Sequence, residues 1–495
     1  MRVKLSRKRE RVEGANGEKP VHGWLRIILP VLGILVVLMF AKGGWRNLSL
    51  EYFFLFGGLL VLCLCGRELL RVFVSDEALK RSFLPLMLTM LAVSICEIQV
   101  GGFAFARLAP ASAHGGGLTR GLLACPNVFV PFFVAMLYGG PVALVIGLIT
   151  SIAIAMVKDF DLAAFLISIC STCLAVRKAT RASTYLDVVK VLCGVAVFQL
   201  FVLGIGVFSF MRSGDDAVTR MAVVQFGIFY GLFVLSGILL ALVLHPAEKF
   251  TKRISNITVH KYADLEHPLL KRLSLKTPGT YHHVMMVGDL AQAAADAIGA
   301  NGLLARAGAY YHDIGKLSLP SYYMENQSGS ENPHDDLPPN ISRIIIMNHV
   351  KEGLVLAAYN RLPEVLRRFI ATHHGTSIAR WFLMKERKRL EAVGPAAEKS
   401  ADPENYYRYP GPLPVTREET IVSLADSVEA ASRSMRFFDR AKIENLVNSI
   451  IADRWADGQL AASELTNAEL AVVRQSFTTS LVHLLHGRLP YPSQK

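Results

Sequence analysis

The C-terminal part of the chain lacks cysteine. All seven cysteines lie upstream of residue 194, which excludes a disulfide framework or a cysteine-ligated zinc site downstream. Charged residues are also few, at 19% of the 495 residues, whereas 52% are hydrophobic. This balance is too apolar for one soluble domain, and the chain is too long for one ordinary core. We therefore expect two parts of different character.

The apolar residues are concentrated upstream of about residue 246. Runs of about 20 apolar residues span a bilayer, and shorter runs serve when neighbouring helices support them. We predict a basic cytoplasmic tail at 1–24, a transmembrane domain at 25–246 and a juxtamembrane connector at 247–276. The eight predicted spans are 25–41, 51–66, 83–106, 122–139, 141–157, 161–176, 187–211 and 221–246. Three of them are short, so a count of six or seven spans stays open.

Positive charge is the second feature of this half. Much of the net charge of +13 lies beside the predicted spans, beginning with MRVKLSRKRER. Basic loops mark the cytoplasmic side of a membrane, so we predict a multi-pass protein of the cell membrane with both termini cytoplasmic. The predicted partner is the lipid bilayer and not a nucleic acid polymer. A transporter is disfavoured because Glu97 is the one obvious intramembrane charge.

The remaining residues, 277–495, predict an all-α domain, because helical spacing dominates and strand-type alternation is scarce. One helix is expected to begin after Thr277 and to end at Gly299, and the next to end at Gly315. Two further helices are expected at 363–375 and 416–435. The fold class predicted for the whole chain is a polytopic helical membrane domain followed by an all-helical domain.

Histidine and aspartate recur at the predicted helix ends and faces of this domain. Imidazole and carboxylate groups in this order suit a di-metal site in which one carboxylate bridges two ions. The candidate ligands are His312, Asp313, His349, His373, His374 and Asp426.

One more ligand is expected from the helix that carries His282 and His283. Steps of 7, 11 and 15 residues from His283 reach Leu290, Ala294 and Ile298, which form an apolar face. The same analysis from His282 reaches aspartates, so His283 is the candidate that points inward.

Several motifs of this domain resemble those of a known family. The runs HPLLKRL, PGTYHH, GAYYHDIGKL, ENQ, NPHD, HVKEG, HHGTS, RYPGP and LADSVEAASRS strongly resemble the bacterial seven-transmembrane HD hydrolases. Members of that family hydrolyse the second messenger cyclic di-AMP to the linear dinucleotide pApA. The resemblance covers about residues 262–435 densely, and the membrane half by architecture only.

The resemblance implies two metal-binding sets that share Asp313. His283, His312 and Asp426 would complete one set, and His349, His373 and His374 the other. It implies manganese or iron, which the donor types also favour. It implies an HD phosphohydrolase domain at 277–495 and a catalytic role for Asp313, and Lys316 is placed to hold a phosphate oxygen.

The chain departs from that family because only AKGGWRNLSL separates its first two predicted spans, where a large extracytoplasmic domain is typical. Related HD-GYP enzymes, which open cyclic di-GMP, carry a GYP signature that is absent here, and some add a third-metal glutamate where this chain has Gly279.

Several alternatives stay open at this level. The substrate could be a guanosine tetraphosphate-like nucleotide or cyclic di-GMP, and the domain could be a non-catalytic receptor. A homodimer is also open, as is the role of the predicted loop 376–407. Weaker candidates for substrate binding are Asn332, His334, Arg408 and Tyr409.

Overall fold

The described part of the chain is helical. The computed structural model describes residues 50–73, 86–96, 128–157, 160–211, 216–327, 332–393, 403–435 and 439–486. Over these residues every regular element is a helix, and the one β-type pairing is an isolated bridge between Ile378 and Arg408. The predicted all-α fold class is therefore confirmed.

The chain divides into two compact units. The N-terminal unit comprises Met1–Thr180 and Val188–Leu244, and the C-terminal unit comprises Arg181–Asp187 and His245–Lys495. Helices of the N-terminal unit are α2 (Leu50–Phe73), Leu86–Cys96, α5 (Phe129–Tyr138), α6 (Gly140–Val157), α7 (Leu162–Ala179), α8 (Tyr185–Met211) and α9 (Asp216–Thr251), the last of which continues beyond the unit.

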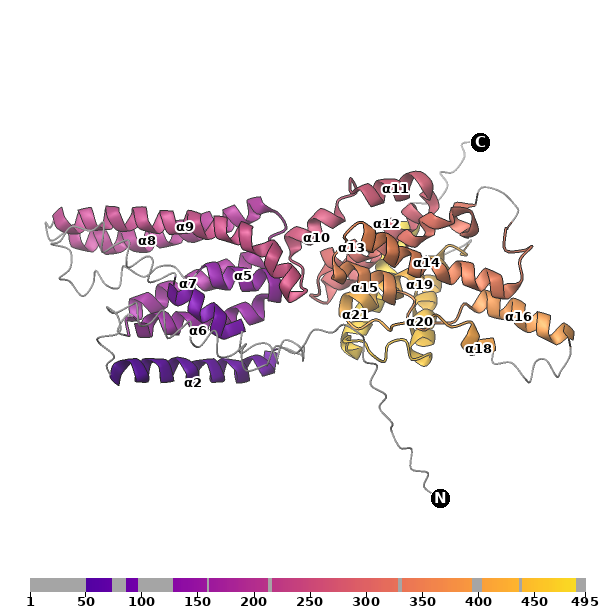
Figure 1. Cartoon of the computed structure of the whole chain (residues 1–495), viewed down its shortest axis with the longest axis horizontal. Coiled ribbons are helices and arrows are strands. Elements are labelled where there is room, and N and C mark those ends of the chain that lie inside the picture. Colours follow the sequence, from indigo (N-terminus) through magenta and orange to yellow (C-terminus); the bar gives the residue numbers. More distant parts are fainter. Residues whose placement is uncertain are drawn as a thin grey trace, which may run out of the picture. The chain divides into compact units, whose positions relative to one another are not determined.

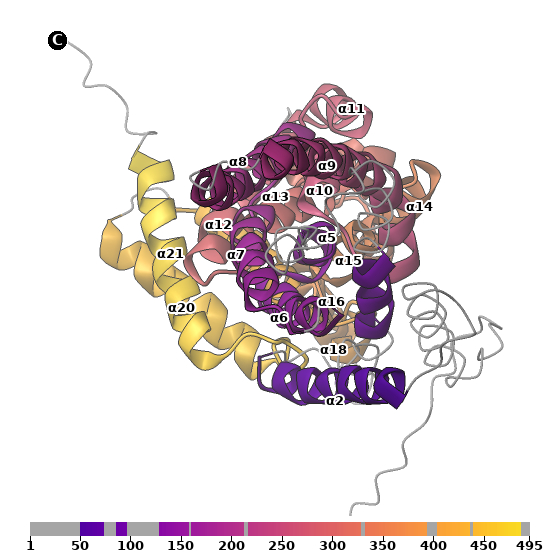
Figure 2. The same ribbon diagram turned by 90° about the vertical axis from the view of Figure 1, so that its left-hand side faces the viewer.

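In the N-terminal unit α6 packs against α2, α5 and α7, and Figures 1 and 2 both show α8 and α9 side by side. Three segments are long and apolar enough to cross a membrane, namely α6, α7 and Tyr185–Val202 of α8. Helices coincide with seven of the predicted spans in whole or in part. The tail 1–24, the span 25–41 and Glu97 lie outside the described residues, and the span count stays a prediction.

The C-terminal unit is a bundle built around α12 (Pro278–Ala297), which packs against α11, α13, α19 and α21 (Figure 1). Its small buried residues, such as Ala291 and Ala294, allow close helix approach. The other helices are α10 (Asn256–Ala263), α11 (Pro268–Lys276), α13 (Gly302–Tyr311), η3 (Ile314–Ser318), η4 (Pro320–Tyr322), η5 (Met324–Asn326), α14 (Pro339–Tyr359), α15 (Glu364–Thr372), α16 (Arg380–Val393), α18 (Pro403–Tyr406), α19 (Arg417–Ser432), α20 (Arg440–Ala456) and α21 (Asn467–His486).

Three details differ from the expectations. The α13 helix ends at Tyr311, and Gly315 lies in η3. A Cβ atom on Gly315 would lie 1.8 Å from the carbonyl oxygen of His349, so glycine is needed for η3 to approach α14. Thr277 precedes α12, but its hydroxyl donates to the carbonyl of Leu273 and does not cap the helix. The predicted loop 376–407 contains α16 and α18.

The core of this unit includes Phe369 of α15, whose ring is 1% exposed and lies against Gly308 of α13. We expect Phe369→Ala to destabilise the unit by about 3–5 kcal/mol, because it removes buried apolar area and leaves a cavity. Thermal unfolding of the full chain in detergent checks this, with a midpoint lower by about 10 °C.

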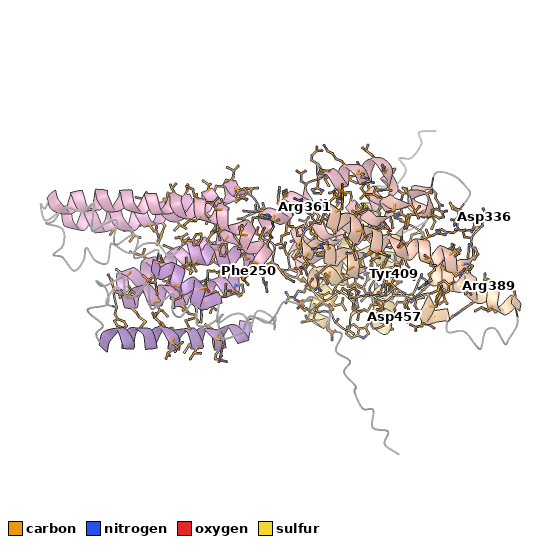
Figure 3. All side chains as sticks on the ribbon, viewed as in Figure 1. Phe250, Asp336, Arg361, Arg389, Tyr409 and Asp457 are labelled. Atoms are coloured by element: carbon orange, nitrogen blue, oxygen red, sulfur yellow. The ribbon has the colours of Figure 1, made fainter. Side chains whose placement is uncertain are left out.

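The matched control is Phe250→Ala, because the Phe250 side chain is 92% exposed (Figure 3). Equal effects of the two substitutions on the midpoint would contradict the placement of Phe369 in the core.

Candidate metal centre

The predicted ligands come from separate elements of the C-terminal unit and meet in one buried site. Each lies in or directly after a helix of the bundle, so the packing of that bundle sets their mutual distances. They are His283 in α12, His312 and Asp313 after α13, His349 in α14, His373 and His374 after α15, and Asp426 in α19.

Asp313 lies between two sets of histidines, and its side chain is 3% exposed. Its Oδ2 atom is 3.3 Å from Nε2 of His312 and 3.6 Å from Nε2 of His283. Its Oδ1 atom is 3.4 Å from Nε2 of His349 and 3.7 Å from Nε2 of His373. A carboxylate with one oxygen toward each set has the geometry of a bridging ligand.

Asp426 adds a second carboxylate to the same site. Its Oδ1 atom is 3.1 Å from Nε2 of His283, and its Oδ2 atom is 3.8 Å from Nδ1 of His374. Two groups have ligand atoms that all lie within 4.8 Å of one another, and they are His283, His312 and Asp313, and His349, His373 and His374.

Three of the histidines are oriented by the same local contact. The Nδ1 atom of His312 lies 2.6 Å from the carbonyl oxygen three residues earlier, and His349 and His373 make the equivalent contact at 2.6 and 2.9 Å. A carbonyl only accepts a hydrogen bond, so Nδ1 carries a proton, and Nε2 is the ring nitrogen left for the site. This outer contact is typical of metal-ligating histidines.

Glu429 orients His283 and was not among the predicted site residues. Its Oε2 atom lies 2.5 Å from Nδ1 of His283, and its carboxylate also accepts from Nε of Arg433 at 2.9 and 3.0 Å. Glu429 follows Asp426 by one helical turn on α19, and this spacing is the signal by which the sequence could have indicated it.

The site carboxylates are ionised. Burial alone would raise the pKa of Asp313, but Lys316 and His312 outweigh burial and hold that pKa well below its usual value. The pKa of Asp426 is likewise held well below its usual value, against its burial, by the hydrogen bond from His283 and by the nearby His312. The site therefore presents two buried negative charges.

The histidines on the far side of Asp313 are neutral. Burial, followed by the charge of His312, lowers the pKa of His373 to about 3. Burial and the neighbouring His373 lower the pKa of His374 well below its usual value, and burial also lowers the pKa of His349. Neutral imidazole is the form that binds a metal ion.

The donor set fits a pair of divalent cations. The Nε2 atom of His312 and the Oδ1 atom of Asp313 are buried and make no hydrogen bond, although buried polar atoms ordinarily have a partner. A divalent cation held by these ligands would supply the partner that both atoms lack. Imidazole and carboxylate donors without cysteine suit manganese, iron or zinc.

Lys316 and Glu325 border the site. The Nζ atom of Lys316 is 2.7 Å from Oδ2 of Asp313 and 2.8 Å from Oε1 of Glu325. Although burial opposes it, the pKa of Lys316 is raised by these two carboxylates, so the ammonium stays charged. Glu325 belongs to the ENQ motif, but no role was predicted for it.

Gly279 leaves no room for a further ligand from the start of α12. A Cβ atom there would lie 1.7 Å from the carbonyl oxygen of Glu325. The third-metal glutamate of some HD-GYP enzymes therefore has no place at this position.

The weaker substrate candidates have different surroundings. Tyr409 is buried, and its ring lies 4.2 Å from that of His374, centroid to centroid. Arg408 is bound to Asp457 at 2.8 Å and to the carbonyl of Thr376 at 3.0 Å.

The other two candidates lie in one loop. His334 is buried, its Nε2 atom is 3.0 Å from the carbonyl of Tyr322, and its ring contacts Phe382. The Oδ1 atom of Asn332 accepts from the backbone N–H of His334 at 3.1 Å. Of the four candidates, Tyr409 is the one in ring contact with predicted metal ligands.

Comparison with known proteins matches residues 280–431 to the HD domain family. The chain is 41% identical over 239 residues to the cyclic-di-AMP phosphodiesterase PgpH of Bacillus subtilis, covering 48% of this chain and 32% of that protein. It is 43% identical over 233 residues to PgpH of Listeria monocytogenes, covering 47% of this chain and 31% of that protein. The chain thus spans about a third of the length of these relatives.

A solved structure is also similar in sequence. The crystal structure of the L. monocytogenes PgpH HD domain in complex with cyclic-di-AMP is 42% identical to the matched part, with a TM-score of 0.42. The match covers 45% of this chain and 99% of that one.

Glu429 provides a test of the metal centre that does not remove a ligand. We expect Glu429→Gln to weaken manganese binding by about 10–100-fold, because His283 loses the charged partner that orients it and raises its basicity. Isothermal titration calorimetry on the full chain in detergent measures this. The control is Glu444→Gln, at an exposed position of α20. Unchanged affinity in Glu429→Gln would show that His283 needs no such support.

Proposed function

Because this chain belongs to the HD hydrolase family, we propose that its C-terminal unit is a metal-dependent phosphodiesterase that hydrolyses cyclic di-AMP to pApA. The observation that carries the proposal is the Asp313 carboxylate, with Oδ2 facing His283 and His312 and Oδ1 facing His349 and His373. The substrate is proposed from the sequence identity to two cyclic-di-AMP phosphodiesterases. We propose the same phosphodiesterase activity for the whole chain.

We propose the two metal-binding sets that the resemblance to the HD hydrolases implies. His283, His312, Asp313 and Asp426 would hold one ion, and Asp313, His349, His373 and His374 the other, with manganese or iron as the resident metals. When bound, two such ions activate water for attack on phosphorus and neutralise the charge that develops on the phosphate oxygens.

The surrounding residues bind and orient the substrate in this proposal. The Lys316 ammonium lies beside Asp313, where it holds a non-bridging phosphate oxygen and stabilises negative charge in a site that is largely shielded from water. The Tyr409 ring lies against His374 and offers an apolar face to the nucleotide. Arg408 is assigned to the fold and not to the substrate, because Asp457 and the Thr376 carbonyl already engage its guanidinium.

The N-terminal unit is proposed to anchor the enzyme in the cell membrane, with the HD domain and the N-terminus in the cytoplasm. Three described segments have the length and composition for a membrane span, and the basic loops favour this orientation. The role that follows is control of the level of a second messenger at the cytoplasmic face of the membrane.

The decisive experiment offers cyclic di-AMP, cyclic di-GMP and guanosine tetraphosphate in parallel to the full chain in detergent with manganese. We expect selective conversion of cyclic di-AMP to pApA, and loss of this activity to background in Asp313→Ala, because the shared ligand is removed.

The control is Asp336→Ala, since Asp336 is exposed and lies at the rim of the unit (Figure 3). Cleavage of only a guanine nucleotide would assign a different substrate. Binding of cyclic di-AMP without cleavage by the metal-loaded protein would make the unit a receptor, and retained turnover in Asp313→Ala would refute the site.

A further inference from the structure

Lys316 is shared between two carboxylates, only one of which belongs to the proposed ligand sets. Its Nζ atom is 2.7 Å from Oδ2 of Asp313 and 2.8 Å from Oε1 of Glu325, and both the lysine and the glutamate side chains are 14% exposed. Largely buried charges are costly unless they are paired. The proposed function uses Asp313 and Lys316 and leaves Glu325 without a role.

Glu325 is itself held by the beginning of α12. The hydroxyl of Thr280 donates to Oε1 of Glu325 at 3.0 Å, and the side-chain amide of Asn326 donates to that hydroxyl at 2.9 Å. The backbone N–H of Thr280 donates to Oδ1 of Asn326 at 3.1 Å, and Gly279 allows this close approach. These contacts tie Glu325 to the helix that carries His283, four residues after Gly279 in the chain.

The oxygen of Asp313 that contacts Lys316 is also the oxygen that faces His283 and His312. A divalent cation bound at those two histidines and the Lys316 ammonium would therefore compete for the same oxygen. Two cations at one carboxylate oxygen repel each other, and in a site that is poorly screened by water this repulsion is strong. A second carboxylate within reach of Nζ removes the conflict.

We propose that Glu325 is a positioning residue, which holds the Lys316 ammonium at the edge of the site when a metal ion engages Asp313. This assignment rests on the proposed function. In it, Glu325 orients Nζ of Lys316 toward the phosphate of the substrate. Among the described residues, the carboxylates that pair with Lys316 are Asp313 and Glu325, so without Glu325 the ammonium pairs with Asp313 and opposes metal binding there.

The assignment differs from two other roles for Glu325. If Glu325 bound a metal directly, its loss would weaken metal binding whether or not Lys316 is present. The same holds if Glu325 only maintained the fold around Thr280. A positioning role acts through Lys316 alone, so its effect on metal binding disappears when Lys316 is removed.

The test is a double-mutant cycle read by manganese binding. Isothermal titration calorimetry on the full chain in detergent compares the wild type with Glu325→Gln, Lys316→Met and the double variant. We expect Glu325→Gln to raise the manganese Kd by about tenfold. The double variant should match Lys316→Met to within about twofold, because the competing ammonium is gone from both proteins.

Glu266→Gln serves as the matched control, since Glu266 is an exposed carboxylate ion-paired with Lys271 outside the site. It should leave the Kd unchanged, and equal unfolding midpoints for all variants exclude a folding defect. An unchanged Kd in Glu325→Gln would overturn the proposal. A double variant weakened about tenfold relative to Lys316→Met would also overturn it, since Glu325 would then act without Lys316.

An activity measurement separates this proposal from the function on which it rests. At saturating manganese, Glu325→Gln should lower kcat for cyclic di-AMP about 10–100-fold, and it should have no further effect on Lys316→Met. If the wild type cleaves no cyclic di-AMP, the proposed function fails. The binding cycle still decides whether Glu325 acts through Lys316.

Discussion

The C-terminal unit is organised around the buried carboxylate of Asp313. A buried charge is tolerated only when its surroundings compensate it, and here the compensation comes from several elements at once. Histidines from α12, α14 and the ends of α13 and α15 face the two oxygens, and Lys316 pairs with one of them. The bundle must therefore bring together segments that are far apart in the chain, and its small buried residues allow that approach.

The same local hydrogen bond fixes the ring orientation of three histidines of the site. His312 and His373 lie directly after a helix, and His349 lies within one, yet each directs Nδ1 to the carbonyl three residues earlier. The last carbonyls of a helix have no partner inside it, so a side chain at the helix end can satisfy one of them at no cost to the helix. The adjacent residue, such as Asp313, is then free to point into the site.

Two carboxylates at the edge of the site, Glu429 and Glu325, contact other site residues and are not proposed metal ligands. Glu429 contacts His283 on the side away from the site, whereas Glu325 contacts Lys316 at its edge. Neither belongs to the proposed ligand sets, but each contacts a residue to which we assign a role, His283 in metal binding and Lys316 in phosphate binding. Mutation of such an outer partner typically weakens metal affinity about 10–100-fold.

The amino-acid sequence by itself determined the helical class, the division into an apolar and a polar half, and the inward face of α12. His283 is buried and His282 is exposed, as the spacing of apolar residues predicted, because helical periodicity is a local property. The order of histidines and aspartates indicated a di-metal site for the same reason, since helix-end signals are local. Only the tertiary structure decided the partners. Glu325 reaches Lys316 and Thr280 through a close approach at Gly279, and Arg408 is engaged by Asp457, 49 residues later. Contacts between distant segments depend on how the helices pack, and no periodicity within one segment encodes them.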